Sequence, residues 1–266
     1  AFCLPLVVAL VAVCVGYHSA CNIGVEKVSL QTPKLSSEVG RLKIAQISDV
    51  HLGLVVGAGR LQKIVKVIAA EKPDLLVSTG DLIDGRFKAM TGLAPLIRSI
   101  PTPLGKYAVT GNHEFYAGLP MALEVTRQAG FKILRGEGVS IPGLISIAGV
   151  DDPTGRRMGS LPPVSERTLR SALPRDQFAV LLKHQPRVLK ASPGLFDLQL
   201  SGHTHKGQIF PFGLIVKYFF PYDSGLFTLA KQSHLYVSRG TGTWGPPIRF
   251  LADPEVTIIE LVSTAK

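Results

Sequence analysis

The chain has 266 residues, 46% of them hydrophobic, and carries a formal net charge of +10 at pH 7. This length suits one large domain and leaves little for a second. The three cysteines, Cys3, Cys14 and Cys21, all lie near the N-terminus, which excludes a disulfide framework, thiolate metal sites and a cysteine nucleophile from the rest of the chain.

Residues 1–21 form an apolar segment that has no charged side chain between Ala1 and Tyr17. A helix of this stretch would be about 25 Å long, slightly less than a hydrocarbon core of about 30 Å. Three interpretations compete: the apolar region of a secretory signal, a single membrane anchor, and the end of a transmembrane helix whose start is missing. Because no basic residue precedes the apolar run and the chain begins with Ala, we favour a membrane anchor or truncated transmembrane helix over 1–21. A lipid-modified Cys21 is a further alternative, but His18 stands where a small or branched apolar residue is normally required.

Residues 22–40 contain Ser, Thr, Pro and Glu and are interpreted as a connector, so the folded domain is predicted over 41–264. From there, strand-like apolar runs alternate with segments of helical periodicity. Strands are predicted at 42–48, 75–79, 107–110, 139–141, 144–150, 178–183, 198–201, 235–238 and 256–261, and helices at 60–70, 95–100 and 119–129, with a loop at 151–163. The alternation predicts an α/β fold in which two sheets pack face to face with helices outside.

Two further stretches allow two interpretations each. The aromatic and apolar run at 210–220 (FPFGLIVKYFF) is either a core strand or a membrane-facing lip. Basic residues gather between Arg156 and Lys190, and this indicates either a solvated face or attraction to anionic lipid headgroups or a phosphate-bearing substrate. Because aromatic residues are not interleaved with these charges, no specific nucleic-acid partner is predicted.

Five short motifs each follow an apolar run: DVH at 49–51, GD at 80–81, GNHE at 111–114, a lone histidine at 184, and GHTH at 202–205. In open α/β sheets, ligands gather where such strands end. Alternate residues beyond a strand project to the same side, and Gly80 permits the tight turn that points Asp81 into a site. Asp, Asn and His supply oxygen and nitrogen ligands for divalent transition metals. The motifs therefore predict a metal-dependent hydrolase.

The order of these motifs resembles that of the calcineurin-like metallophosphoesterase superfamily, and the resemblance covers about residues 42–261. It implies an α/β fold of two packed mixed β-sheets flanked by helices, with a dinuclear metal site at the strand ends. One metal would be bound by Asp49, His51, Asp81 and His205, and the other by Asp81, Asn112, His184 and His203, so that Asp81 bridges. The two divalent metal ions would be Mn²⁺, Fe²⁺/Fe³⁺ or Zn²⁺.

The same resemblance implies the catalytic groups. His113 matches the histidine that contacts the phosphate and assists the leaving oxygen, and Asp84 matches a residue that orients it. Some members carry a phosphate-binding Arg directly after that Asp, but here Gly85 precedes Arg86, which argues against Arg86 in this role. Glu114 replaces the commoner Asp without removing a metal ligand. The expected reaction is in-line attack by a metal-bound hydroxide without a covalent intermediate.

Together with the N-terminal apolar segment, the motifs resemble the membrane-associated bacterial branch that includes YkuE- and YaeI-type phosphodiesterases and a UDP-2,3-diacylglucosamine pyrophosphatase. This implies cleavage of phosphodiester or pyrophosphate bonds at an anionic membrane surface, on a lipid-linked substrate, at the bacterial inner membrane. Near the C-terminus, Gly240, Gly242 and Gly245 are expected to let the backbone approach a ligand. Trp244 either contacts an acyl chain or base or packs in the core. The alternatives are a generic phosphomonoesterase or nuclease of the same superfamily, and a non-catalytic binding module.

Overall fold

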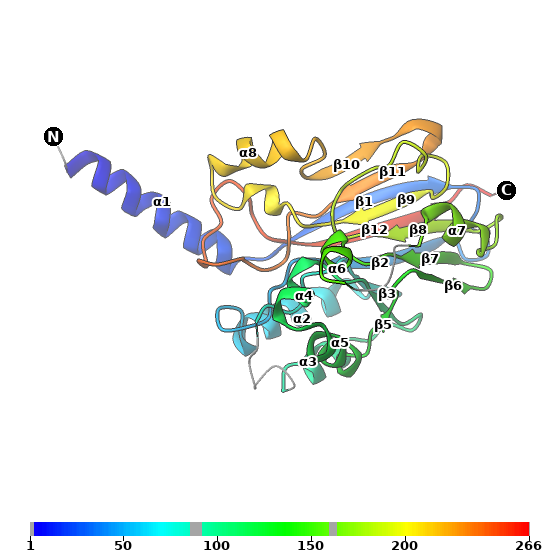
Figure 1. Cartoon of the computed structure of the whole chain (residues 1–266), viewed down its shortest axis with the longest axis horizontal. Helices are drawn as coiled ribbons and strands as arrows, with labels where there is room; N and C mark the ends of the chain where they lie inside the picture. The colour runs from blue at the N-terminus through cyan, green and yellow to red at the C-terminus, as the bar shows by residue number, and fades with distance from the viewer. Residues whose placement is uncertain (1–2, 86–91, 160–163, 266) are drawn as a thin grey trace.

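The computed structural model describes residues 3–85, 92–159 and 164–265. Within these residues the chain forms two six-stranded mixed sheets (Figure 1). The first sheet has the order β1 (Gly24–Thr32), β12 (Glu255–Ser263), β2 (Arg41–Ile47), β3 (Leu75–Ser78), β4 (Lys106–Ala108) and β5 (Lys132–Ile133). The second sheet has the order β10 (Gly225–Thr228), β11 (His234–Val237), β9 (Leu198–Ser201), β8 (Phe178–Leu182), β7 (Ile145–Gly149) and β6 (Glu137–Ile141). The predicted α/β class and pair of packed sheets are confirmed.

The side chains of alternate strand positions build the layers. Ile44 of β2 points into a core that also contains Ile147 and Val180 of the second sheet, so this core joins the two sheets. The neighbouring Ala45 points to the opposite face, where α2 (Ala58–Glu71) contributes Leu61 to a second core. The strict alternation follows from the two-residue period of a strand. Each sheet thus has one face against the other sheet and one face toward helices.

The remaining helices lie along the edges and outer faces of the sheets. They are α3 (Ala94–Arg98), α4 (Asn112–Ala117), α5 (Leu119–Gln128), α6 (Pro153–Arg157), α7 (Glu166–Ser171) and α8 (Phe212–Phe219), with short 3₁₀ turns η2 (His205–Gly207) and η3 (Ala230–Gln232). In Figure 1, α2, α3 and α5 cover the outer face of the first sheet. Helix formation at 58–71 follows from apolar positions spaced three and four residues apart, which place Leu61, Ile64 and Ile68 on the buried face.

The parallel strands bring the motifs to the same edge. Strands β2, β3 and β4 pair in parallel, and so do β7, β8 and β9. Asp49, Asp81 and Asn112 follow the carboxyl ends of three of these strands, and His184 and His203 follow the ends of β8 and β9. Because the carboxyl ends of parallel strands face the same way, the two sheets deliver five motif segments to one place.

Residues 22–40 are not a connector throughout, because they contain β1. This strand pairs in parallel with β12 along its whole length, from Gly24 opposite Glu255 to Thr32 opposite Ser263. The predicted start of the folded region at Arg41 is therefore too late. The residues of β1 alternate between exposed and buried, and Val28 and Leu30 lie in the core between the sheets.

Other local features also differ from what the sequence analysis expected. The GNHE motif begins a helix, α4, and the segment 151–163 contains helix α6, whose cap Asp152 accepts a hydrogen bond from the Thr154 backbone. The run at 210–220 is not a core strand. It forms α8, none of whose residues is buried. Of the basic stretch, Lys183 is buried and paired with Glu166 at 2.9 Å, so that charge does not belong to a surface.

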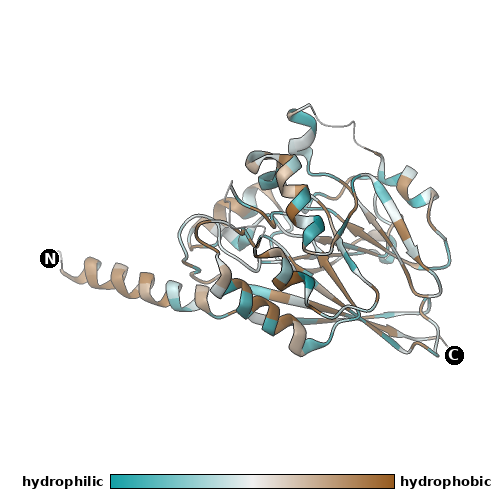
Figure 2. Ribbon diagram, turned by 90° about the horizontal axis from the view of Figure 1, so that it is seen from below, coloured by the Kyte–Doolittle hydropathy of each residue, from teal (hydrophilic) through white to brown (hydrophobic). Residues whose placement is uncertain are grey.

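Helix α1 (Cys3–Cys21) projects from the body, and only Gly16 and Ala20 are buried within it (Figures 1 and 2). It is long and apolar enough to cross a membrane. Its last turn contacts the body, because the Arg60 guanidinium donates to the Ala20 carbonyl and the Arg249 backbone N–H donates to the Gly16 carbonyl at 2.8 Å. The C-terminal end of α1 is therefore fixed to the domain, and the rest of the helix is apolar and exposed.

Candidate metal centre

The motif residues adopt a strained backbone. Asp49, His51, Asp81, His203 and His205 all have φ between 49° and 74°, in the left-handed region. For residues other than glycine this conformation costs roughly 1–2 kcal/mol each. Such strain persists where the surrounding structure determines it, and it is concentrated at functional sites. Here it turns each side chain sharply away from the direction of its strand and into the space between the two sheets' edges.

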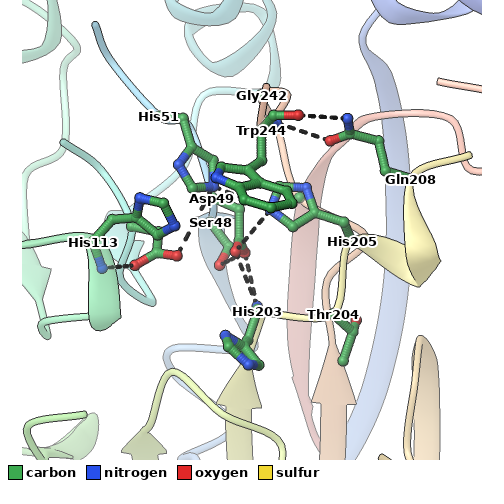
Figure 3. A network of polar contacts seen from close by, with 12 residues as sticks. Ser48, Asp49, His51, His113, His203, Thr204, His205, Gln208, Gly242 and Trp244 are labelled. Carbon is green, nitrogen blue, oxygen red and sulfur yellow. Dashed lines mark hydrogen bonds and ion pairs between the residues drawn. The ribbon is translucent and has the colours of Figure 1, made fainter. Parts of the chain in front are cut away.

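The first cluster contains Asp49, His51 and His205 (Figure 3). His205 Nε2 lies 3.3 Å from Asp49 Oδ1 and 3.1 Å from His51 Nε2. The carboxylate of Asp49 is fully buried and is fixed from behind, because the His203 backbone N–H donates to it at 3.0 Å and the Ser48 hydroxyl donates to Oδ2. The atoms that offer lone pairs converge from the DVH and GHTH motifs.

The second cluster contains Asp81, His184 and His203, with Asn112 beside it. His184 Nε2 lies 3.2 Å from Asp81 Oδ2, 3.2 Å from Asn112 Oδ1 and 3.1 Å from His203 Nδ1. His184 is fully buried. Four motif segments therefore place their donor atoms around one point.

Asp81 lies between the two clusters. Its Oδ2 is 3.2 Å from His184 Nε2 and 3.9 Å from His51 Nε2, which belong to different clusters. Its Oδ1 accepts the His113 backbone N–H at 2.8 Å, which fixes the orientation of the carboxylate. One oxygen atom thus faces both sets of imidazoles.

The donor set fits cations. His184 Nδ1 lies 2.8 Å from the Thr79 carbonyl, which only accepts, so Nδ1 carries a proton and a neutral ring keeps its lone pair at Nε2. His184 Nε2 faces the oxygens of Asp81 and Asn112 and a ring nitrogen of His203, so this position holds either a proton or, in its place, a cation. On the other side, His51 Nδ1 is buried and makes no hydrogen bond within the described residues, and its neighbour there is Asp84 Oδ2 at 3.5 Å.

The pKa values show the same need for positive charge. Burial opposes ionisation of Asp81, but His184 and His51 lower its pKa to about 2, and His205 leads the groups that hold the pKa of Asp49 well below its usual range. Burial also opposes protonation of His184, yet Asp81 raises its pKa well above the usual value. By contrast, burial lowers the pKa of His203 and of His205 to about 4. Both carboxylates are thus anionic at neutral pH and surrounded by imidazole nitrogen.

His113 and Asp84 form, with His51, a third group of side chains whose ligand atoms lie close together, beside the first cluster. His113 Nδ1 lies 3.0 Å from Asp84 Oδ1, and Asp84 Oδ2 lies 3.5 Å from His51 Nδ1. Burial opposes protonation of His113, but the hydrogen bond to Asp84 and the nearby carboxylates raise its pKa. The His113 side chain is only partly buried, so a bound ligand can reach it. Arg86 lies outside the described residues.

Glu114 has a role that the motif alone did not indicate. Its carboxylate is buried and accepts four backbone N–H groups: Oε1 from Leu82 at 2.7 Å and Ile83 at 3.1 Å, and Oε2 from Asp81 at 3.0 Å and Gly111 at 2.7 Å. It therefore ties the GD loop to the GNHE loop. The sequence signal was a Glu three residues after the helix cap Gly111, the position from which the Glu of a capping box accepts the cap backbone N–H, as Glu114 does here.

Arg249 was also not predicted. Its side chain is fully buried, and its guanidinium donates to the carbonyls of Gly242, at 2.6 Å, and of His205, at 3.1 Å, while Nη2 lies 3.1 Å from His205 Nδ1. It thus holds the GHTH loop against the C-terminal segment 240–249. Burial lowers its pKa to about 9, so the guanidinium keeps its charge at neutral pH.

The glycines at 240 and 242 let the chain pack closely against itself. A Cβ on Gly242 would lie 2.0 Å from the Val50 carbonyl oxygen, and one on Gly240 would lie 3.1 Å from Asp49 Cβ. These glycines let the segment pass directly against the DVH motif. Gly245, in contrast, has φ of 65° and open space around it.

A pocket of about 400 Å³ opens beside the clusters. Its lining includes His51 and Asp84 on the polar side and Leu54, Val55 and Trp244 on the apolar side. Trp244 is 56% exposed and its ring centroid is 6.2 Å from that of His113, so the core-packing interpretation of Trp244 is wrong. A ligand whose charged group binds the clusters could place an apolar part against Leu54, Val55 and Trp244.

Comparison with known proteins identifies the family. The family model for calcineurin-like phosphoesterases matches residues 42–207. An uncharacterized metallophosphoesterase of Aquifex aeolicus is 41% identical over 94% of this chain and 97% of its own length. The uncharacterized metallophosphoesterase YkuE of Bacillus subtilis is 37% identical over 84% of this chain and 79% of its own. A transmembrane protein with metallophosphoesterase domain from Danio rerio is 32% identical over 88% of this chain, which spans 56% of that protein.

Solved structures share the fold at low identity. The Haemophilus influenzae NAD nucleotidase superposes with a TM-score of 0.52 and 16% identity over 76% of this chain and 45% of its own. A dimetal phosphatase from Danio rerio gives a TM-score of 0.50 and 14% identity over 77% of this chain and 89% of its own. The sequence matches and the groups of side chains that could hold metal ions lead to one conclusion: the chain belongs to the calcineurin-like phosphoesterase family and is a hydrolase acting on phosphoesters.

Proposed function

We propose that the chain is a dinuclear-metal phosphohydrolase that cleaves phosphodiester or pyrophosphate bonds. Asp49, His51 and His205 would hold one divalent cation, Asn112, His184 and His203 would hold the other, and Asp81 would be available to both. The observation that carries this proposal is the position of Asp81 Oδ2, which faces His51 of one cluster and His184 of the other. Manganese, iron or zinc suits this set of oxygen and nitrogen ligands.

The chemistry requires both the ions and the side chains around them. Bound divalent cations supply Lewis acidity, which activates water and offsets the charge of the phosphate oxygens. Asp84 accepts from His113 Nδ1, which leaves the other ring nitrogen to face the substrate and give a proton to the leaving oxygen. The buried carboxylate of Glu114 keeps the GD and GNHE loops in register with each other. These residues orient the ester and hold the proton at His113.

The finer part of the proposal concerns the substrate, which we place in the lipid-linked class at a membrane surface. Three observations support it: the apolar helix α1, the net charge of +10, and the apolar wall of the pocket formed by Leu54, Val55 and Trp244. A relative named as a transmembrane protein agrees with it. A lipid-linked nucleotide diphosphate such as UDP-2,3-diacylglucosamine offers both a pyrophosphate and acyl chains. The bacterial inner membrane is the compartment that this substrate class implies.

The proposal is tested with purified full-length chain loaded with Mn²⁺ in detergent. Wild-type chain should hydrolyse bis-p-nitrophenyl phosphate, and Asp81→Ala should bind less metal and lose activity by more than about a thousandfold, because the shared ligand is gone. Asp176→Ala, which removes an exposed carboxylate, is the matched control. An active Asp81→Ala chain would overturn the dinuclear assignment. Faster cleavage of p-nitrophenyl phosphate than of the diester would favour the phosphomonoesterase alternative.

A further inference from the structure

Helix α8 is an apolar helix that the described part of the chain leaves uncovered. No residue of α8 is buried, and Leu214 and Tyr218 are 66% and 84% exposed. Phe212, Ile215 and Phe219 are exposed as well. A contiguous group of large apolar side chains on a protein surface marks an interaction site rather than a solvated face. We call the side chains of Phe210, Phe212, Leu214, Ile215, Tyr218 and Phe219 the α8 face.

The composition of α8 is typical of a helix at a lipid interface. Its sequence, FGLIVKYF, contains aromatic and aliphatic residues, one basic residue, Lys217, and no acidic residue. Tyr and Trp are enriched at the headgroup level of membranes, and a basic side chain there is attracted to anionic lipids. A short helix of this kind binds a bilayer with its apolar side chains at the boundary between headgroups and acyl chains.

The α8 face is linked directly to the helix that we propose as the membrane anchor. The Phe210 backbone N–H donates to the Phe250 carbonyl at 3.1 Å, and the Phe250 N–H donates to the Gln208 carbonyl at 3.0 Å. The next residue back, Arg249, donates its N–H to the Gly16 carbonyl of α1 at 2.8 Å. Figure 1 shows α8 at the same end of the molecule as the attachment of α1. A bilayer that contains α1 would therefore lie at this end.

The α8 face also adjoins the candidate metal centre. The helix follows η2, which contains His205, and a Cβ on Gly207 would lie 2.2 Å from the Gly213 backbone nitrogen, so the two turns pack tightly. At the other end of α8, the Phe220 ring centroid lies 5.1 Å from that of His203. Both histidines of the GHTH motif are thus close to an end of α8: His205 lies in η2, which packs against the start of the helix, and His203 contacts Phe220 at its end.

Trp244 joins this arrangement from the pocket side. Its backbone N–H donates to Gln208 Oε1 at 2.8 Å, and Gln208 Nε2 donates to the Trp244 carbonyl at 2.7 Å (Figure 3). Gln208 lies two residues before Phe210, where the α8 face begins. Gln208 therefore links two segments: the one that contains Trp244, whose indole is exposed, and the one that leads into α8.

We propose that the α8 face inserts into the surface of the bilayer that contains α1, and that this second contact sets the mouth of the metal-site pocket against the lipid headgroups. The occupant of the face is thus phospholipid. The inference rests on the proposed function for its anchor, α1, and deepens it by naming the surface that presents a lipid-linked phosphate to the site. One membrane helix alone does not fix the tilt of the domain relative to the bilayer, whereas two contacts do.

The test uses fluorescence, because Trp244 is the single tryptophan of the chain. Full-length chain with Trp244→Phe and Ile215→Trp carries its one indole on α8. Full-length chain with Trp244→Phe and Ser171→Trp carries it instead on α7, which Figure 1 shows at the opposite end of the molecule, and serves as the control. Both are reconstituted in vesicles of anionic phospholipid with or without bromine on the acyl chains.

Bromine quenches an indole that touches it, so the Ile215→Trp emission should fall by about twofold or more in brominated vesicles and the Ser171→Trp emission should hardly change. Adding Leu214→Glu to the Ile215→Trp chain should reduce the quenching, because a carboxylate is repelled by the anionic surface. Equal quenching of the α7 and α8 indoles overturns the proposal, as does an α8 indole protected by dimers of the chain. The readout needs no catalysis, so failure of the lipid contact is distinguishable from failure of the hydrolase assignment.

Discussion

Glu114 offers the sharpest single test of how the loops of the metal centre are held. Replacing it with Gln keeps the shape but exchanges one carboxylate oxygen for an amide that donates. Each oxygen accepts two backbone N–H groups, so at least two buried N–H groups, from either the Leu82–Ile83 pair or the Asp81–Gly111 pair, lose their acceptor and face a donor. An unsatisfied buried donor costs about 1–3 kcal/mol, which gives about 2–6 kcal/mol of lost stability for Glu114→Gln.

The measurement is urea unfolding of the metal-free, detergent-solubilised chain, with metal content determined in parallel. Glu124→Gln on the exposed side of α5 is the matched control, and its free energy of unfolding should change by less than about 0.5 kcal/mol. Because Glu114 fixes the backbone on both sides of Asp81, we also expect weaker metal binding in Glu114→Gln. A Glu114→Gln chain with wild-type stability and wild-type metal content would refute this role.

Three further outcomes are expected. His113→Ala should lower kcat about 10²–10⁴-fold while metal content stays at the wild-type level, since the ring contributes proton transfer rather than ligation; loss of metal would contradict this. In the metal-free chain, carboxylates raise the pKa of His184 despite its burial, so His184 carries an extra proton that a cation must displace. Metal affinity, measured by competition with a chelator, should therefore rise about tenfold for each pH unit near neutrality and fall as the pH drops. Gly242→Ala should destabilise the chain to urea by about 3 kcal/mol or more, because its Cβ would overlap the Val50 carbonyl, whereas Gly57→Ala, in open space, should change stability little.

The grouping of the motif side chains was predictable because they lie in short local patterns. Each motif follows an apolar run, and strands such as β2 and β8 are recognisable from that run alone. The geometry then follows from topology, since parallel strands present their carboxyl ends together. The contacts of Glu114 and Arg249 were not predictable in this way. Their residue types are visible in the sequence, but their partners come from other loops, and only the fold brings those together.

Strand β1 and helix α8 are among the elements that were missed, and the structure gives a physical reason for each. Strand β1 has alternating exposed and buried residues and no apolar run, and its stability comes from pairing with β12 more than 200 residues away. A pairing at that distance leaves no local signal. The run that forms α8 is short and apolar throughout, and periodicity does not separate a buried strand from a helix in such a segment. Its exposure, rather than its sequence, shows that it is not part of the core.

The central claim is that Asp81 joins two clusters into one dinuclear centre. The most direct test is a crystal structure of the Mn²⁺-loaded chain with anomalous scattering recorded at the manganese edge, supported by metal analysis of the same sample. We predict two manganese ions per chain, with the Asp81 carboxylate bound to both, Asp49, His51 and His205 on one, and Asn112, His184 and His203 on the other. A single ion, or two ions of which only one contacts Asp81, would contradict the account.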